Sequence, residues 1–175
     1  GKAIANGMPL SALVGKKKYM RKVEDIFFSG AYLGETLSLA AGIATIKEME
    51  KKQVLEKIRK KGEYLQAGTS GLIAEIGLGD VVRIAGHPTW QLFIFSEGYG
   101  YKPLEIKSYI QQELLQAGFL WSGSHNMSLA HSQEDLDRLL GAYKKIFAKL
   151  KTLLVSHKLR QNLAGRPISD VFKVR

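Results

Sequence analysis

Residues 80–95, DVVRIAGHPTWQLFIF, contain the pattern that decides the fold. Asp80–Ala85 and Gln91–Phe95 are short runs rich in β-branched and aromatic residues, and the Gly-His-Pro tripeptide 86–88 separates them. Such runs with a turn between them predict two neighbouring strands. The stretch therefore predicts a small, mostly antiparallel sheet, because strands joined by a short turn run in opposite directions.

Helices are predicted on both sides of this stretch. Pro103 begins a helix that reaches about Gln116, and Ser132 followed by Asp135 forms a capping box before an amphipathic helix that extends to Leu153. The other expected elements are a short buried strand at Leu10–Val14, a loop at 27–35, helices at Thr36–Met49 and Gln53–Ile76, and strands at Phe119–Trp121 and Asn126–Leu129. This order predicts an α+β domain in which helices cover a small sheet.

The composition is that of a globular protein with a basic surface. No apolar run among the 175 residues reaches the roughly 18 residues that a transmembrane helix requires. The 26 Lys and Arg residues exceed the 16 Asp and Glu residues, which gives a formal net charge of +10. Because the lysines fall in separate clusters, we expect solvated helix faces rather than a nucleic-acid interface. We expect a cytoplasmic protein whose partners include neither nucleic acid nor a membrane.

Cysteine is absent, which excludes disulfides, thiolate metal sites and cysteine nucleophiles. The four histidines share no metal-ligand spacing, so no metal site is expected. The chain begins at Gly1 without an initiator methionine, inside a glycine-rich, apolar segment that is typical of a structured motif. We therefore expect it to be a piece of a longer protein.

The segment with the clearest chemical meaning is GKAIANGMPLSALVG at residues 1–15. Lys2 stands among small residues, so its amine could approach a planar cofactor or a carbonyl without steric hindrance. Such an amine forms a Schiff base when burial or a cationic neighbour lowers its pKa. Most lysines are solvated surface residues, so Lys2 alone does not decide between a surface role and a catalytic one.

The wider pattern resembles the class-III pyridoxal-phosphate (PLP) aminotransferases, and among them the proteins similar to glutamate-1-semialdehyde aminomutase. The spacing from Gly1-Lys2 to Asn6-Gly7 is similar to the family's Schiff-base lysine segment. Three later stretches are similar to family segments in the same order: FFSGAYLGETLSLAAGIATI (27–46), SLAHSQEDLDRLLGAY (128–143) and PISDVFKVR (167–175).

The resemblance implies an α/β protein, the C-terminal part of a PLP-dependent transferase of fold type I. Residues 1–35 would end the large cofactor-binding domain, residues 36–76 would be linking helices, and residues 77–175 would be the small α+β domain. Lys2 would be the catalytic, cofactor-binding lysine of a homodimeric aminotransferase or aminomutase. The substrate would be a small-molecule amino donor or acceptor, an amino aldehyde or a keto compound.

The resemblance also places Ser29, Gly30 and Ala31 on the loop that crosses the dimer interface toward the partner's cofactor phosphate. The family usually has a threonine where Ala31 stands, and a methyl group cannot donate a hydrogen bond. The backbone N–H groups of residues 29–35 would therefore have to bind the phosphate. The family's N-terminal part, which holds the Asp that pairs with the pyridine nitrogen, has no counterpart here. We therefore expect the chain alone to be inactive.

The loop Ser122–Met127 departs from the family pattern for substrate recognition. Many members carry an arginine there that binds the donor's carboxylate, and the aminomutases often carry an acidic residue. This loop has neither, which indicates a changed specificity. The sequence leaves open which substrate is used and whether the reaction is a transamination or an aminomutase reaction.

Two further residues are candidates for substrate contact, each with a structural alternative. Glu35 could line the mouth of the partner's site or interact with the N-terminus of the following helix. His125 could contact substrate or be a locally hydrogen-bonded turn residue. The aromatic residues Trp90, Trp121 and Phe93–Phe95 are expected in the core.

Two alternatives to an enzyme remain from the sequence. The chain could be a non-catalytic dimerisation or ligand-binding module derived from this family. It could also bind an anionic partner through its positive charge, in which case binding would depend steeply on salt.

Overall fold

Two units make up the protein in this computed structural model, which describes residues 3–169. The first unit is Gly1–Leu55 and the second is Glu56–Arg175. The three-part domain division inferred from the resemblance stays a prediction. Within the described residues, no helix combines the length and the apolar character needed to cross a membrane.

The first unit contains α1 (Lys17–Met20), the 3₁₀ helix η1 (Arg21–Asp25) and α2 (Thr36–Lys51). The loop predicted at residues 27–35 and the helix after it are confirmed. The strand predicted at Leu10–Val14 is wrong, because this segment is irregular. Leu13 and Val14 are 70% and 83% exposed. An apolar run becomes a strand only beside a strand with which it can pair, and no described residue of this unit offers one.

The second unit is built on the antiparallel sheet β1-β2-β3. Its strands are β1 (Val82–His87), β2 (Trp90–Phe95) and β3 (Ser124–Asn126). The hairpin predicted from residues 80–95 is confirmed, with Val82 opposite Phe95 and His87 opposite Trp90. The strand predicted at Phe119–Trp121 is wrong, and the one predicted at Asn126–Leu129 is displaced, because the pairing segment is Ser124–Asn126 and shares only Asn126 with it.

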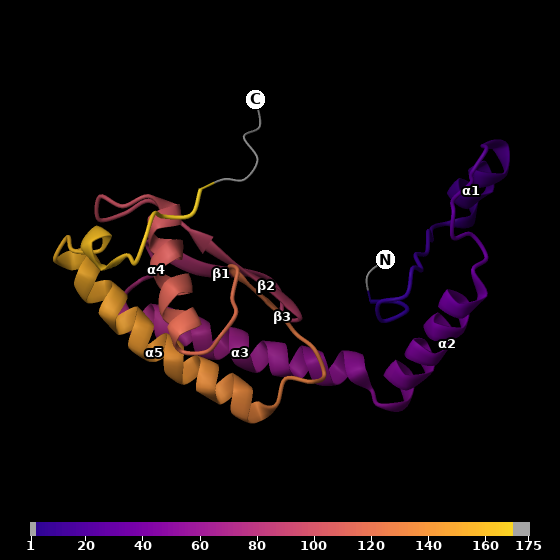
Figure 1. The fold of residues 1–175 in the computed structure, drawn as a ribbon. Helices are drawn as coiled ribbons and strands as arrows, with labels where there is room; N and C mark the ends of the chain where they lie inside the picture. Colours follow the sequence, from indigo (N-terminus) through magenta and orange to yellow (C-terminus); the bar gives the residue numbers. More distant parts are fainter. Residues whose placement is uncertain (1–2, 170–175) are drawn as a thin grey trace. The chain divides into compact units, whose positions relative to one another are not determined.

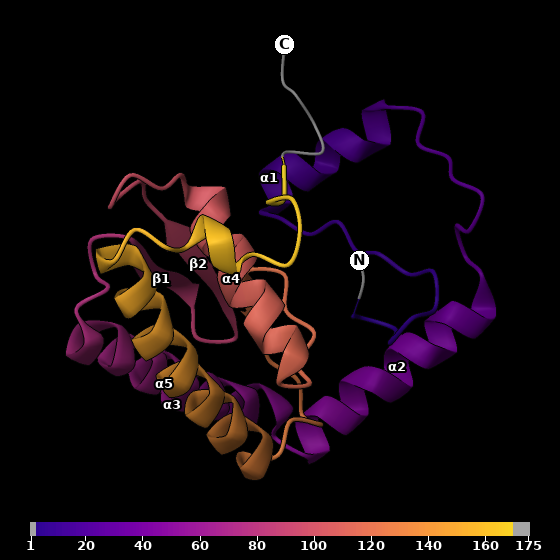
Figure 2. The same ribbon diagram turned by 60° about the vertical axis from the view of Figure 1, so that its left-hand side comes forward.

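Three helices, α3 (Val54–Ile76), α4 (Pro103–Gln116) and α5 (Gln133–Val155), pack with one face of this sheet (Figures 1 and 2). A short 3₁₀ helix, η2 (Arg160–Asn162), follows α5. Side chains from the sheet, α4 and α5 form one apolar core, whose fully buried members include Ile110, Tyr143 and Phe147. Pro103 begins α4 as predicted. The capping box of α5 is also confirmed, since Ser132 and Asp135 each accept a backbone N–H from the other.

The opposite face of the sheet is open among the described residues of this unit. Trp90 and Leu92 point to this face and are 59% and 39% exposed. The prediction that Trp90 is a core residue is therefore wrong, because strand alternation turns it away from Phe93. Phe93 and Trp121 are buried as expected, with their rings edge to face at 4.9 Å.

Gly62 permits a close approach between α3 and the turn that joins β1 to β2. A Cβ atom at this position would overlap the carbonyl group of Pro88. The side-chain amide of Gln91 donates to both the Gly62 and the Pro88 carbonyl oxygens at 2.7 Å. A glycine inside a helix is ordinarily unfavourable, but Gly62 is required here for the packing of α3.

We predict that Gly62→Ala destabilises the second unit. Overpacking against a rigid backbone costs about 1–3 kcal/mol, which exceeds the gain of up to about 1 kcal/mol from replacing a helical glycine by alanine. Gly71→Ala is the matched control, because it lies in the same helix and nothing within 4 Å would meet its new methyl group. Urea denaturation should show a loss of stability for the first variant and no loss for the second. Equal stability of the two variants would contradict the close approach.

Candidate functional site

The predicted cofactor lysine, Lys2, lies outside the described residues. The predicted phosphate-loop residues Ser29, Gly30 and Ala31 lie on an exposed segment between η1 and α2. Among the described residues, the backbone N–H groups of these three residues meet no acceptor, whereas the Gly30 carbonyl accepts from Leu33. The segment therefore presents free donors to solvent, which suits the binding of an anionic group.

Glu35 is the N-cap of α2. Its carboxylate accepts the backbone N–H groups of Leu37 at 2.8 Å and Ser38 at 2.6 Å. This favours the helix-terminus alternative for Glu35, because both carboxylate oxygens are used to satisfy the first turn. The helix predicted to begin at Thr36 does begin there, with Glu35 as the residue before it.

His125 lies on β3 and is only 6% exposed. Its Nδ1 is 3.0 Å from Gln91 Oε1, and its Nε2 is 2.7 Å from the hydroxyl of Tyr143. The Phe93 ring lies edge to face with the imidazole at 5.1 Å. Both nitrogens of His125 are thus engaged inside the second unit, and its contact with substrate stays a prediction.

The partners of Gln91 determine the tautomer of His125. Gln91 uses its amide nitrogen to donate to two carbonyl oxygens, so its Oε1 is the atom that faces His125. His125 Nδ1 must therefore carry the proton and donate to it, and the unprotonated Nε2 accepts from Tyr143. This Tyr143–His125–Gln91 chain, which continues to the Gly62 and Pro88 carbonyl groups, satisfies every polar group along it.

Burial keeps this histidine neutral. Loss of hydration, with a smaller effect from the charge of His131, lowers the pKa of His125 from 6.5 to about 4. Burial also raises the pKa of Tyr143 well above its usual value. The hydrogen-bond chain therefore holds no charge at neutral pH.

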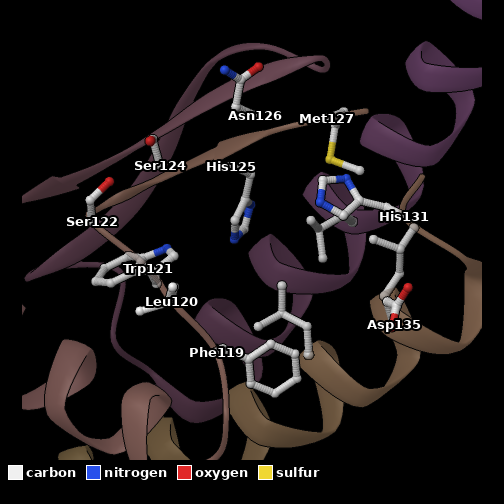
Figure 3. A pocket seen from close by; sticks show the side chains of 13 residues that line it. Phe119, Leu120, Trp121, Ser122, Ser124, His125, Asn126, Met127, His131 and Asp135 are labelled. Carbon is white, nitrogen blue, oxygen red and sulfur yellow. The ribbon is translucent and has the colours of Figure 1, made fainter. Parts of the chain in front are cut away.

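A pocket of about 440 Å³ lies beside this chain in the second unit. Figure 3 shows His125 and the segment Phe119–Trp121 facing the pocket, with His131 and Asp135 beside it. Five of the six residues of the loop Ser122–Met127 contribute to its lining. Among the described residues, no group of three or more His, Asp or Glu side chains is placed to hold a metal ion.

The structure places the predicted candidates in two different units. Ser29, Gly30, Ala31 and Glu35 share one short segment of the first unit, and His125 belongs to the second. Sequence reasoning missed Gln91 and Tyr143 as partners of His125. Strand alternation contains one usable signal, because it places the polar Gln91 on the same buried face as Phe93.

Comparison with known proteins gives a consistent result. Residues 1–87 match the model of the aminotransferase class-III family. The chain is 29% identical over 165 residues to glutamate-1-semialdehyde 2,1-aminomutase of Methanocella arvoryzae, covering 86% of this chain and 38% of that protein. It is also 29% identical over 159 residues to 3-aminobutyryl-CoA aminotransferase of Cloacimonas acidaminovorans, covering 88% and 37%. The chain thus spans less than two fifths of the length of these relatives.

Two solved structures share the fold. The FumI protein of Sphingopyxis sp. MTA144, in its PLP internal aldimine form, superposes with a TM-score of 0.71 at 26% identity, over 87% of this chain and 36% of that one. A transaminase with PLP bound gives the same TM-score at 22% identity, over 87% and 38%. The small antiparallel sheet with its helices is therefore part of a fold found in PLP-dependent transaminases.

We predict that Glu35→Ala loosens the first turn of α2, because two backbone N–H groups lose their acceptor. Loss of an N-cap acceptor destabilises the first turn of a helix. Hydrogen exchange of the amides of Leu37 and Ser38 should accelerate in this variant and return toward the wild-type rate in Glu35→Asp. Unchanged exchange in Glu35→Ala would show that the carboxylate does not cap the helix.

We predict that the neutral, buried His125 makes its full contribution to the unfolding free energy above pH 6.5. This contribution should decrease as the pH falls toward about 4. Between these values the unfolded chain binds a proton that the folded chain does not, so the loss is about 1.4 kcal/mol per pH unit. His125→Gln removes this titration while keeping a polar side chain. The difference in unfolding free energy between wild type and variant should therefore become smaller as the pH falls from 6.5 toward about 4. A difference that stays constant over this range would contradict a buried, neutral imidazole.

Proposed function

Because residues 1–87 match the aminotransferase class-III family, we propose that the chain is the C-terminal part of a PLP-dependent aminotransferase or aminomutase of this family, in which Lys2 is the cofactor lysine. The observation that carries this proposal is the family match over residues 1–87, which includes both the Lys2 segment and the Ser29–Ala31 loop. By this proposal, residues 1–35 are the last part of the large domain, and residues 77–175 form the small domain. Residues 36–76 are the helices that connect the two.

Lys2 would act through its side-chain amine. A neutral amine attacks a carbonyl carbon, so a lowered pKa is required. The glycine and alanine on either side of Lys2 leave room for a planar group to approach. PLP, when bound, supplies the electron sink for breaking bonds at the amino-bearing carbon. The protein's contribution is then to hold the cofactor and to move a proton on Lys2.

The loop Ser29–Ala31 would bind the cofactor phosphate through its backbone. Its three N–H groups meet no acceptor among the described residues, and the segment is exposed. A phosphate accepts several such bonds at once, which makes the missing threonine hydroxyl at Ala31 dispensable. By the family pattern, the phosphate belongs to the site of a second copy.

The exposed apolar side chains of the first unit support a homodimer. Phe27 is 97% exposed, and Phe28, Tyr32, Leu33 and Leu37 are between 59% and 66% exposed. Soluble proteins seldom leave so many large apolar side chains of one segment in water. Covering them by a second copy would bring the Ser29–Ala31 loop to the partner.

The substrate would be a small amino donor or acceptor. The loop Ser122–Met127 has no arginine or acidic residue, so it lacks the charged groups with which a carboxylate or an amine of the substrate would pair. The proposal therefore stops at amino-group transfer to or from an aldehyde or ketone. The 175-residue chain alone would be inactive, because the family's partner for the pyridine nitrogen is not in this sequence.

The test uses the natural polypeptide that contains these 175 residues. With PLP added, borohydride reduction and peptide mapping should locate the adduct on the peptide of Lys2. Lys2→Ala should abolish the absorbance of lysine-bound PLP. The exposed Lys16 provides the matched control, since Lys16→Ala should keep both the absorbance and the adduct.

An unchanged spectrum in Lys2→Ala, or an adduct spread evenly over the surface lysines, would refute the assignment. A protein that binds no PLP under these conditions would favour the non-catalytic module instead.

A further inference from the structure

The pocket of about 440 Å³ in the second unit has the size of a small-molecule site. We propose that it binds an arylalkyl primary amine, with the aromatic body inside the pocket and the ammonium group at Asp135. This site lies entirely within the second unit, and its occupancy does not depend on PLP or on the proposed function.

The inner wall of the pocket suits an apolar body. Leu65 of α3 and Leu136 and Leu139 of α5 line it, together with Met127. Leu120, which also lines the pocket, is 94% exposed although it is a large apolar residue. A hydrocarbon body placed against these side chains would remove apolar surface from water, which is favourable in proportion to the area covered.

The charge of the lining selects the head group. No lysine or arginine lines the pocket, although the whole chain has a net charge of +10. Asp135 is the lining residue with a full charge at neutral pH. Its Oδ2 accepts from the backbone and hydroxyl groups of Ser132, whereas its Oδ1 has no hydrogen-bond partner among the described residues. An ammonium group can donate to that oxygen, whereas a carboxylate is repelled by it.

Two histidines, His131 and His125, also line the pocket. The ring nitrogen Nδ1 of His131 accepts the backbone N–H of Ser128 at 3.1 Å, and His125 is neutral within its hydrogen-bond chain.

A second, independent observation points to an aromatic body. The indole Nε1 of Trp121 is buried and has no hydrogen-bond partner among the described residues, and the whole residue is 8% exposed. Figure 3 shows the edge of the indole that carries this nitrogen turned toward His125 and the pocket. A buried N–H without an acceptor is unfavourable, and the face of an aromatic ring is a weak acceptor for it.

Three ligands of one skeleton test the head-group preference: 4-phenylbutylamine, 4-phenylbutan-1-ol and 4-phenylbutanoate. Binding is followed at pH 7 in ¹H–¹⁵N NMR spectra of the 175-residue chain without PLP. The chain has two tryptophans, so two indole N–H signals are expected, and Trp90→Phe assigns them. The Trp121 signal should shift on titration with the amine, while the signal of the exposed Trp90 should not.

We expect the amine to bind more tightly than the alcohol by about 3- to 10-fold, the range of a partly solvated charge pair, and the carboxylate to bind most weakly. Asp135→Asn should abolish the advantage of the amine and leave the alcohol's affinity unchanged. Asp137→Asn is the matched control, because Asp137 lies on the same helix, does not line the pocket and interacts with Tyr64 instead.

If Asp135→Asn weakens the N-cap of α5, the comparison of the three ligands on the unmodified chain still tests the proposal. Three results would each overturn it: equal binding of amine and carboxylate, a Trp121 signal that no ligand shifts, or an amine preference that persists in Asp135→Asn.

Discussion

The second unit depends on the hydrogen-bond chain from Tyr143 through His125 to Gln91. Two helices and two strands meet in it, because Tyr143 is on α5, His125 is on β3, and Gln91 on β2 reaches the carbonyl of Gly62 on α3. Each of these bonds contributes only about 1 kcal/mol net, but a buried polar group left without a partner costs about 1–3 kcal/mol. The chain therefore specifies one arrangement of sheet and helices more strongly than an apolar contact of the same size would.

Several features follow from this chain. Gly62 must lack a side chain, because α3 has to approach the turn at Pro88 closely enough for Gln91 to reach both carbonyls. The short strand β3 is held to β2 through His125, and this fixes the loop Ser122–Met127 along the pocket. His125 thus takes part in the packing of the second unit, and its contact with substrate stays a prediction.

The sequence predicted those elements whose signals are local. The hairpin of β1 and β2 follows from alternation around a turn, α4 begins at Pro103, and the capping box marks the start of α5. It failed where burial depends on distant partners. Leu10–Val14 and Phe119–Trp121 have strand-like composition, but neither segment is a strand in the structure.

The candidate site was predictable to a similar extent. The loop at residues 27–35 was expected from its two glycines, and the structure shows such a loop. The environment of His125 was not predictable, because its partners Gln91 and Tyr143 are 34 and 18 residues away in sequence. Two alternatives for Glu35 were equally compatible with the sequence, and the two hydrogen bonds at the helix N-terminus favour the cap.

The central claim is that a cofactor lysine at the start of the chain and a backbone phosphate loop at 29–31 belong to one kind of active site, shared between two copies. A crystal structure of the natural polypeptide that contains these residues, grown with PLP, tests it most directly. The account predicts continuous electron density from Lys2 Nζ to the cofactor and the N–H groups of Ser29–Ala31 from the second copy at the phosphate. Density that joins PLP to another lysine, or a phosphate bound without this loop, would contradict it.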